Sequence, residues 1–194
     1  LDEYSRQYYA HVRAFPTYVS AVHSHCDDIN VRQLLLENLI EEEQGGDNHP
    51  ELWLRFAEGL GVSRESAQAA EPLDSTRDSV AALRDICDGD DYRNGVAALY
   101  AYESQVPEVS RTKREGLAKY YALDDPRAVE FFTIHEEADL RHRAEERAVL
   151  ARECRDATSR DAAVAAAGDA AQALWEFLDG VYDAYVEPCA KCAA

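Results

Sequence analysis

The sequence predicts an all-α protein with a single domain, and three observations support this. Apolar residues recur every three or four positions along most of the chain, which is the period of a helix packed on one face. No stretch alternates apolar and polar residues as a half-buried strand would. No repeat, low-complexity linker or change of composition divides the 194 residues. We therefore expect one domain, residues 1–194, built from about seven or eight helices.

The helix boundaries follow from start and stop signals. Pro16 lies inside the first helix and predicts a kink, and Pro107 predicts a break in a later one. Asp125 before Pro126 indicates a helix start, because aspartate caps helices and proline suits the first helical position. The alanine-rich last helix is expected to pack closely on its neighbours. The predicted helices are residues 2–25, 28–44, 50–60, 63–70, 75–87, 90–121, 126–157 and 160–186.

The composition excludes several classes of partner. Of all residues, 46% are hydrophobic and 30% are charged, which is typical of a globular protein. The 38 acidic and 20 basic residues give a formal net charge of −18, which repels phosphate backbones and anionic lipids. No apolar run approaches the ~18 to 20 residues of a membrane-spanning helix. We therefore expect neither a nucleic acid nor a membrane as partner.

The cysteines and the first residues bear on cellular context. Five cysteines, an odd and mostly scattered set, indicate reduced thiols of a cytoplasmic protein rather than a disulfide framework. Cys189 and Cys192 would suit a redox pair, but two thiols cannot close a zinc site, so we interpret them as a tail. The chain contains no methionine and begins in helical rhythm. We therefore expect the true N-terminus, with an opening helix, to precede residue 1.

The stretch HEEADLRHRAEE, residues 135–146, concentrates two histidines and five carboxylates. At about 100° per residue, His135, Asp139 and His142 lie within roughly 60° of one another on one helix face. The other charged side chains of the stretch are expected to point elsewhere, among them Glu136, Arg141, Arg143 and Glu146. A solvated helix on which acids and arginines pair four residues apart remains the alternative, unless partner ligands exist elsewhere in the chain.

Two other helices each place a single carboxylate on an apolar face. Glu42 continues the apolar stripe of residues 28–44, and Glu103 continues that of residues 90–121. His49 follows Glu42 by seven positions and would share its face if the helix continued through the two glycines between them. Because a buried unpaired carboxylate costs several kcal/mol, these positions require counter-charges.

The inward faces offer mainly histidines rather than lysine or arginine as partners. Three carboxylates and three imidazoles make two sets of ligands for first-row divalent metals. Two divalent ions bring four positive charges against three negative ones, which leaves a near-neutral site open to dioxygen. The ligand set predicts a dinuclear non-haem iron centre, with manganese in one position as a variant. A ferritin-like centre would need two Glu-x-x-His pairs, and the chain has none, which disfavours iron storage.

Other chemistry has little support in the sequence. His11, His23 and His25 lie on the predicted first helix, and we interpret them as satisfied or surface histidines, with contact between one of them and the site as the alternative. No phosphate-binding glycine loop and no nucleophile elbow is present. The site hypothesis therefore rests on the metal ligands.

The order and spacing of these ligands resemble a known family. Glu-x6-His in EEQGGDNH, a lone glutamate in AYESQVPEVSRTK and His-x3-Asp-x2-His in HEEADLRH resemble the haem-oxygenase-like diiron oxidases, relatives of TenA and PqqC. The resemblance spans essentially the whole chain. LLENLIEEEQGGDNHPELWLRFAEGLGVSRE and YESQVPEVSRTK look most like the CADD branch, named for a chlamydial protein associated with death domains.

The resemblance implies a fold, a cofactor and an activity. It implies a seven-helix haem-oxygenase-like bundle with two iron ions, or iron and manganese, and with dioxygen as oxidant. The CADD branch is implicated in making para-aminobenzoate for folate from its own tyrosine ring and a lysine nitrogen. By position, the metal ligands would be Glu42, His49, Glu103, His135, Asp139 and His142.

Other residues take their roles from the same resemblance. Lys113 would donate the amine, and Tyr102, beside Glu103, would support the metals or relay a radical. We expect Lys113 close to the metals, where desolvation and cationic neighbours lower its pKa. The family's sacrificial tyrosine would fall before residue 1, and the nearest phenols are interpreted as packing residues, namely Tyr4, Tyr8 and Tyr9.

Two alternatives stay open at this point. A diiron oxidase that cleaves a C–C or C–N bond of a free amino acid or fatty acid would need a cationic or apolar pocket. A metal-binding interaction module would need a large exposed apolar patch. For the oxygenase, we also expect a homodimer, an external reductant or electron donor, and a cytoplasmic location.

Overall fold

The computed structural model describes residues 1–186, which form nine helical segments and no strand. The segments are α1 (Asp2–His25), α2 (Ile29–Glu43), α3 (His49–Gly59), α4 (Arg64–Gln68), α5 (Asp74–Cys87), α6 (Tyr92–Glu103), α7 (Val106–Tyr121), α8 (Glu130–Glu153) and α9 (Ala157–Tyr185). The all-α prediction is confirmed. The seven helices implied by the resemblance are too few for residues 1–186. The predicted helix 63–70 is present as α4, with 5 residues, and the predicted break near Pro107 separates α6 from α7.

Local signals explain most helix ends. The Asp28 carboxylate accepts a hydrogen bond from the backbone N–H of Asn30 at 2.7 Å and caps α2. Helix α8 begins at Glu130 rather than at Pro126, which corrects the predicted start. The Asp125 carboxylate accepts from the backbone N–H groups of Arg127 and Ala128 at 3.1 and 3.0 Å, and this stretch forms a turn before the helix.

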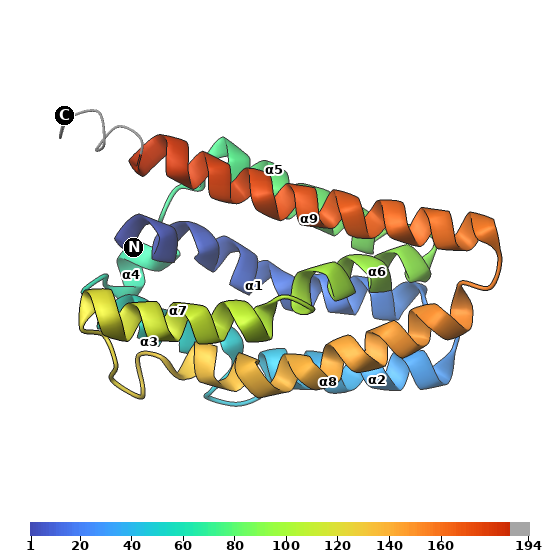
Figure 1. Cartoon of the computed structure of the whole chain (residues 1–194), viewed down its shortest axis with the longest axis horizontal. Helices are drawn as coiled ribbons and strands as arrows, with labels where there is room; N and C mark the ends of the chain where they lie inside the picture. The colour runs from blue at the N-terminus through green and yellow to red at the C-terminus, as the bar shows by residue number, and fades with distance from the viewer. Residues whose placement is uncertain (187–194) are drawn as a thin grey trace.

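The helices lie in three rough layers around α1 (Figure 1). Helices α5 and α9 lie together at one side, α1 and α6 form the middle, and α2 and α8 lie at the opposite side. Helix α1 contacts α2, α3, α5 and α6, so it forms the centre of the hydrophobic core. The indole N–H of Trp53 donates to the carbonyl of Ser5 at 2.8 Å and joins α3 to α1.

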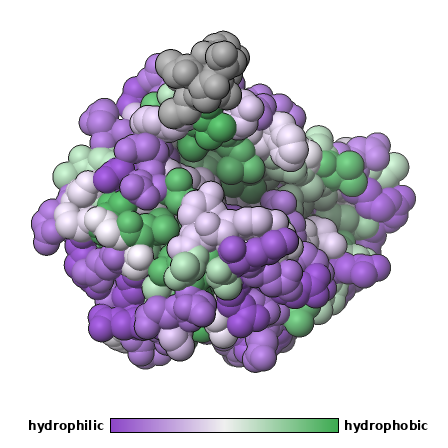
Figure 2. Space-filling view, turned by 60° about the vertical axis from the view of Figure 1, so that its left-hand side comes forward, coloured by the Kyte–Doolittle hydropathy of each residue, from purple (hydrophilic) through white to green (hydrophobic). Residues whose placement is uncertain are grey.

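The surface is mostly hydrophilic, as the net charge predicts. Figure 2 shows the end of the molecule at which α1 begins and α9 ends, where a hydrophobic hollow interrupts the polar surface. Within residues 1–186, no helix combines the length and the apolar character that crossing a membrane requires.

Candidate metal centre

Helix α8 carries four polar side chains on its buried face. His135, Asp139 and His142 are each at most 6% exposed, so the predicted stripe is confirmed. Glu146 is also buried, at 7% exposed, and the prediction that it points elsewhere is wrong. The spacing signal was present, because seven residues from Asp139 is about two helical turns and returns to the same face.

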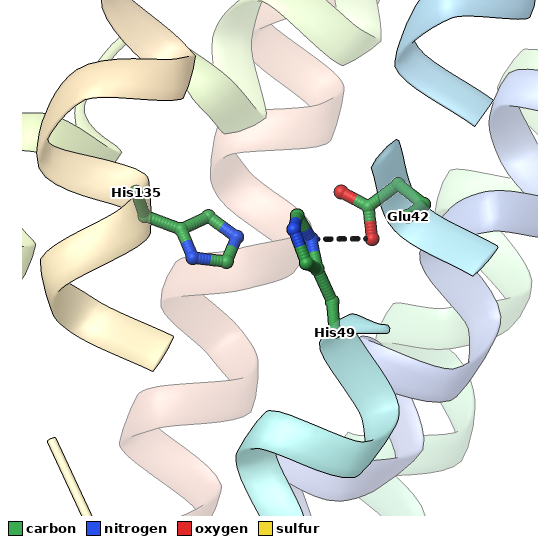
Figure 3. Close-up of side chains that lie close together, drawn as sticks. All are labelled: Glu42, His49 and His135. Carbon is green, nitrogen blue, oxygen red and sulfur yellow. Dashed lines mark ion pairs between the residues drawn. The ribbon is translucent and has the colours of Figure 1, made fainter. Parts of the chain in front are cut away.

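Three helices bring together the imidazole-rich triad, which consists of Glu42 on α2, His49 on α3 and His135 on α8 (Figure 3). One ligand atom of each lies within 4.8 Å of the others. Nδ1 of His49 is 2.8 Å from Oε2 of Glu42, and the two imidazole centroids are 4.3 Å apart. Nδ1 of His135 donates to the carbonyl of Phe131 at 2.6 Å, which leaves Nε2 as the free lone pair.

The turn between α2 and α3 brings His49 to Glu42. Helix α2 ends at Glu43, close to the predicted end at residue 44, and Gly45 adopts a φ of 82°, in the left-handed region, so the helix does not continue through the glycines. The Asn48 side chain then caps α3 by accepting from the backbone N–H of Glu51 at 3.0 Å. Arg55 donates to the Gly46 carbonyl at 3.2 Å and so fixes the turn from the α3 side.

The carboxylate-rich triad consists of Glu103 on α6 and of Asp139 and His142 on α8. Nδ1 of His142 lies 3.2 Å from Oε1 of Glu103 and 3.5 Å from Oδ1 of Asp139. Nε2 of His142 lies 3.1 Å from a carboxylate oxygen of Glu41 and 3.1 Å from the guanidinium of Arg141. Asn38 donates to Oε1 of Glu103 at 2.9 Å. Sequence reasoning missed Glu41 and Asn38 because only the tertiary packing of α2 brings them to their partners, His142 on α8 and Glu103 on α6.

Burial and neighbouring charges shift the pKa values of the site residues in different directions: those of Glu42 and His142 are raised, and that of His49 is lowered. Burial raises the pKa of Glu42 to about 8 and lowers that of His49 to about 4. Burial alone would lower the pKa of His142, but hydrogen bonds with Asp139 and Glu103 outweigh it and raise this pKa to about 10. The carboxylate-rich triad therefore attracts positive charge, which a proton on His142 or a bound cation supplies.

The buried polar atoms that have no hydrogen-bond partner show whether metal ions suit the site. Oε2 of Glu103 and Oδ2 of Asp139 are buried and have no hydrogen-bond donor. Both atoms are acceptors, so a cation satisfies them where a further acceptor would not. Carboxylate oxygens together with imidazole nitrogens are ligands of first-row divalent ions. The residues therefore fit two such ions, one at each triad.

Two cavities lie side by side near the triads. The metal-facing cavity, of about 30 Å³, is lined by Glu42, His49, Tyr102, Glu103, His135, Asp139 and several apolar side chains. It is large enough for a small molecule such as water or dioxygen. The lysine cavity, of about 160 Å³, lies between α1, α7 and α9 and is lined in part by Lys113. Tyr8, Tyr102 and Val106 line both cavities and form their common wall.

Lys113 lies in the lysine cavity and does not line the metal-facing one. Its ammonium donates to the hydroxyl of Tyr4 and lies 4.7 and 5.3 Å from the ring centroids of Tyr4 and Tyr8. Burial lowers the pKa of Lys113, as predicted, but no cationic neighbour contributes. The hydroxyls of Tyr8 and Tyr102 are 2.7 Å apart. Sequence reasoning did not find this contact, because Tyr8 and Tyr102 are 94 residues apart in the chain.

The remaining histidines and cysteines divide into separate cases. His11 is completely buried, and neither ring nitrogen has a partner, so its interpretation as a satisfied or surface histidine is wrong. His25 is exposed and pairs with Asp88 at 3.1 Å. Cys26, Cys87 and Cys154 are buried free thiols. Cys189 and Cys192, which the sequence analysis interprets as a tail, lie outside the described residues.

Comparison with known proteins identifies the family. A family model described as "Iron-containing redox enzyme" matches residues 2–175. The chain belongs to this family of iron-containing redox enzymes. The enzyme is 44% identical over 192 residues to a 4-aminobenzoate synthase of Chlamydia muridarum, covering 99% of this chain and 79% of that protein. It is 42% identical to a 4-aminobenzoate synthase of Nitrosomonas europaea, covering 95% and 79%.

A solved structure confirms the fold of this redox enzyme. A domain of unknown function with a haem-oxygenase-like fold from Shewanella denitrificans superposes with a TM-score of 0.82. The match covers 95% of this chain and 78% of that one, at 19% identity. The predicted haem-oxygenase-like fold is therefore confirmed.

Proposed function

We propose that this redox enzyme is a dinuclear iron oxygenase that makes 4-aminobenzoate from one of its own tyrosine side chains and the nitrogen of Lys113. The observation that carries the proposal is the wall, formed in part by Tyr8 and Tyr102, that the metal-facing cavity and the lysine cavity share. The names of the two relatives, at 44% and 42% identity, support the product. An external reductant would be the electron donor.

Each triad would hold one metal ion. Glu42, His49 and His135 would bind the first, and Glu103, Asp139 and His142 the second. Iron bound there would supply one-electron chemistry with dioxygen, and manganese in one position remains a variant. The apolar wall of the metal-facing cavity, which includes Phe131, limits the access of water to the reaction.

The two tyrosines would connect the cavities. Tyr102 lies next to the ligand Glu103 in the chain, and its hydroxyl is hydrogen-bonded to that of Tyr8. Once one phenol of such a pair has lost both an electron and its proton, the other phenol can restore it by transferring an electron together with the proton of the shared hydrogen bond. We therefore assign to Tyr102 and Tyr8 the relay of an electron and a proton between the two cavities.

Lys113 would act as the nitrogen donor, because an amine is nucleophilic only when unprotonated. Burial favours the neutral amine by lowering the pKa of Lys113. The aromatic rings of Tyr4, Tyr8 and Phe132 surround the side-chain nitrogen and limit the directions in which it can react.

The variant Lys113→Arg tests the nitrogen assignment. We expect it to fold and bind metals but to yield no aromatic amine, because a guanidinium stays protonated. Lys119→Arg, on the exposed side of the same helix, is the matched control. The measurement is mass analysis of the protein and of small-molecule products after anaerobic metal loading and exposure to oxygen. Product from Lys113→Arg at the wild-type rate would contradict the assignment and favour a free substrate.

A further variant tests whether Tyr4 only packs against the lysine. Tyr4→Phe keeps the ring but removes the hydroxyl that accepts from Lys113. We expect product formation to continue in this variant. Loss of product, with metals still bound, would instead identify Tyr4 as the source of the ring.

A further inference from the structure

Glu146 is a buried carboxylate to which the proposed chemistry gives no role. Its side chain lies in the core at 7% exposed, and neither carboxylate oxygen has a hydrogen-bond donor. Among residues 1–186, no lysine, arginine or histidine forms an ion pair with it. A buried carboxylate without a counter-charge costs several kcal/mol, so its presence requires an explanation.

The position of Glu146 relates it to the carboxylate-rich triad. It follows His142 by four residues and Asp139 by seven, so it lies on the same face of α8. Side chains of a helix lean toward its N-terminus, which directs Glu146 back toward these two residues. It also lies within hydrogen-bonding reach of Glu103 on α6. Two ionised carboxylates have no proton with which to form that bond.

The unpaired atoms around Glu146 share one chemical character. Both oxygens of Glu146, Oε2 of Glu103 and Oδ2 of Asp139 are buried acceptors without donors. A water molecule could satisfy some of them, but each of its two protons reaches only one acceptor. A divalent cation bound among such oxygens would offset the charge of several of them at once.

We infer that Glu146 is a further metal ligand, which completes the second metal position together with Glu103, Asp139 and His142. This inference rests on the proposed dinuclear centre. With Glu146 included, four carboxylates balance the four positive charges of two divalent ions. The second position then has one imidazole and three carboxylates, whereas the first has two imidazoles and one carboxylate. The two positions would therefore differ in affinity, with the second favouring ions that prefer oxygen ligands.

A structural role for Glu146 makes a different prediction. In that case, Glu146 would be protonated and would donate a hydrogen bond to Glu103, holding it in place. The substitution Glu146→Gln separates the two roles, because the amide has nearly the same shape and can donate the same bond but is a poor metal ligand. Glu137→Gln is the matched control, since Glu137 is exposed on the same helix.

The experiment is a titration of the metal-free full chain with Mn²⁺ without oxygen, in which free Mn²⁺ is measured by electron paramagnetic resonance. We expect two ions for the wild type and for Glu137→Gln. For Glu146→Gln, we expect the second ion to be lost or to bind at least about tenfold more weakly. Two ions bound to Glu146→Gln with unchanged affinity would overturn the inference and leave the proposed function standing. No binding to the wild type would instead contradict the proposed centre.

A crystal structure of the Mn²⁺-loaded wild type keeps the inference testable if Glu146→Gln fails to fold. We expect an oxygen of Glu146 to coordinate the second ion directly. An oxygen of Glu146 that instead contacts only Glu103, beyond coordination distance of either ion, would overturn the inference.

Discussion

The two triads contain similar ligands but are assembled by different parts of the chain. The carboxylate-rich triad comes from two helices, and Asp139 and His142 are one turn apart on α8. The imidazole-rich triad needs three helices and the turn that joins α2 to α3. Once α6 packs on α8, the helical spacing alone sets most of the carboxylate-rich triad. The imidazole-rich triad depends in addition on a short non-helical segment.

This difference indicates which triad responds more strongly to metal. Gly45 and Gly46 lose more backbone entropy than other residues when the turn becomes ordered, and the carboxylates of residues 41–43 repel one another. Folding the segment inward also buries Glu42, whose pKa is raised by that burial. A bound cation reverses this balance by joining Glu42 to His49. The segment from residue 42 to residue 49 should therefore act as a metal-dependent latch, which means that it becomes ordered when a metal ion binds.

Removal of a ligand has the largest expected effect. His142→Ala and Glu103→Ala should each lose at least one metal ion and abolish oxygen consumption, because each removes a group that would bind the metal directly. Elemental analysis and an oxygen electrode measure the two effects, with the exposed Glu43→Gln as control. A wild-type protein that retains neither iron nor manganese after reconstitution would contradict this prediction.

Hydrogen exchange directly compares the two chain segments that supply ligands to the triads. Without metal, residues 42–49 should exchange rapidly, whereas residues 135–142 on α8 should stay protected. Metal should slow exchange in the first segment by about tenfold or more, since the binding free energy becomes local folding free energy. Mass spectrometry of both states gives the answer. Equal, strong protection of residues 42–49 with and without metal would refute the latch.

The pH dependence of stability should also separate the triads in the metal-free protein. The folded-state pKa of His142, about 10, exceeds the ordinary value of 6.5, so its contribution is complete below pH 6.5 and is lost as pH rises toward 10. The pKa of His49, about 4, is depressed, so stability is lost as pH falls from 6.5 through 4.

Denaturant unfolding measures this effect at several pH values. His142→Gln should flatten the alkaline side of the profile, and His49→Gln should flatten the acid side. Each change should be at least about 1 kcal/mol, since one unit of pKa shift is worth about 1.4 kcal/mol. Identical profiles for the wild type and both variants would show that neither histidine is shifted.

A change in the turn has the smallest expected effect. Gly45→Ala places a side chain at a φ of 82°, which costs about 1 kcal/mol. The first metal ion should then bind about fivefold more weakly, with the second unchanged. Gly46→Ala is the matched control, because a Cβ there meets nothing within 4 Å and the backbone is not left-handed. Equal metal affinities of the two variants would contradict a strained turn.

The sequence by itself determined the helices and the shared face of α8. Proline at position 107 has no N–H with which to continue the preceding helix, so α6 ends at Glu103 and Pro107 lies in the first turn of α7. The spacing of His135, Asp139 and His142 placed all three on one buried face, because a helix has a fixed angle per residue. The same rule, applied fully, also includes Glu146.

Only the tertiary structure decided which groups meet across helices. It brought His49 to Glu42 through a turn rather than a continued helix, and it paired Tyr8 with Tyr102. It also placed Lys113 in a cavity separate from the metal-facing one. The physical reason is that periodicity fixes the direction of a side chain around its own helix axis. The packing of the other helices then decides what that side chain contacts.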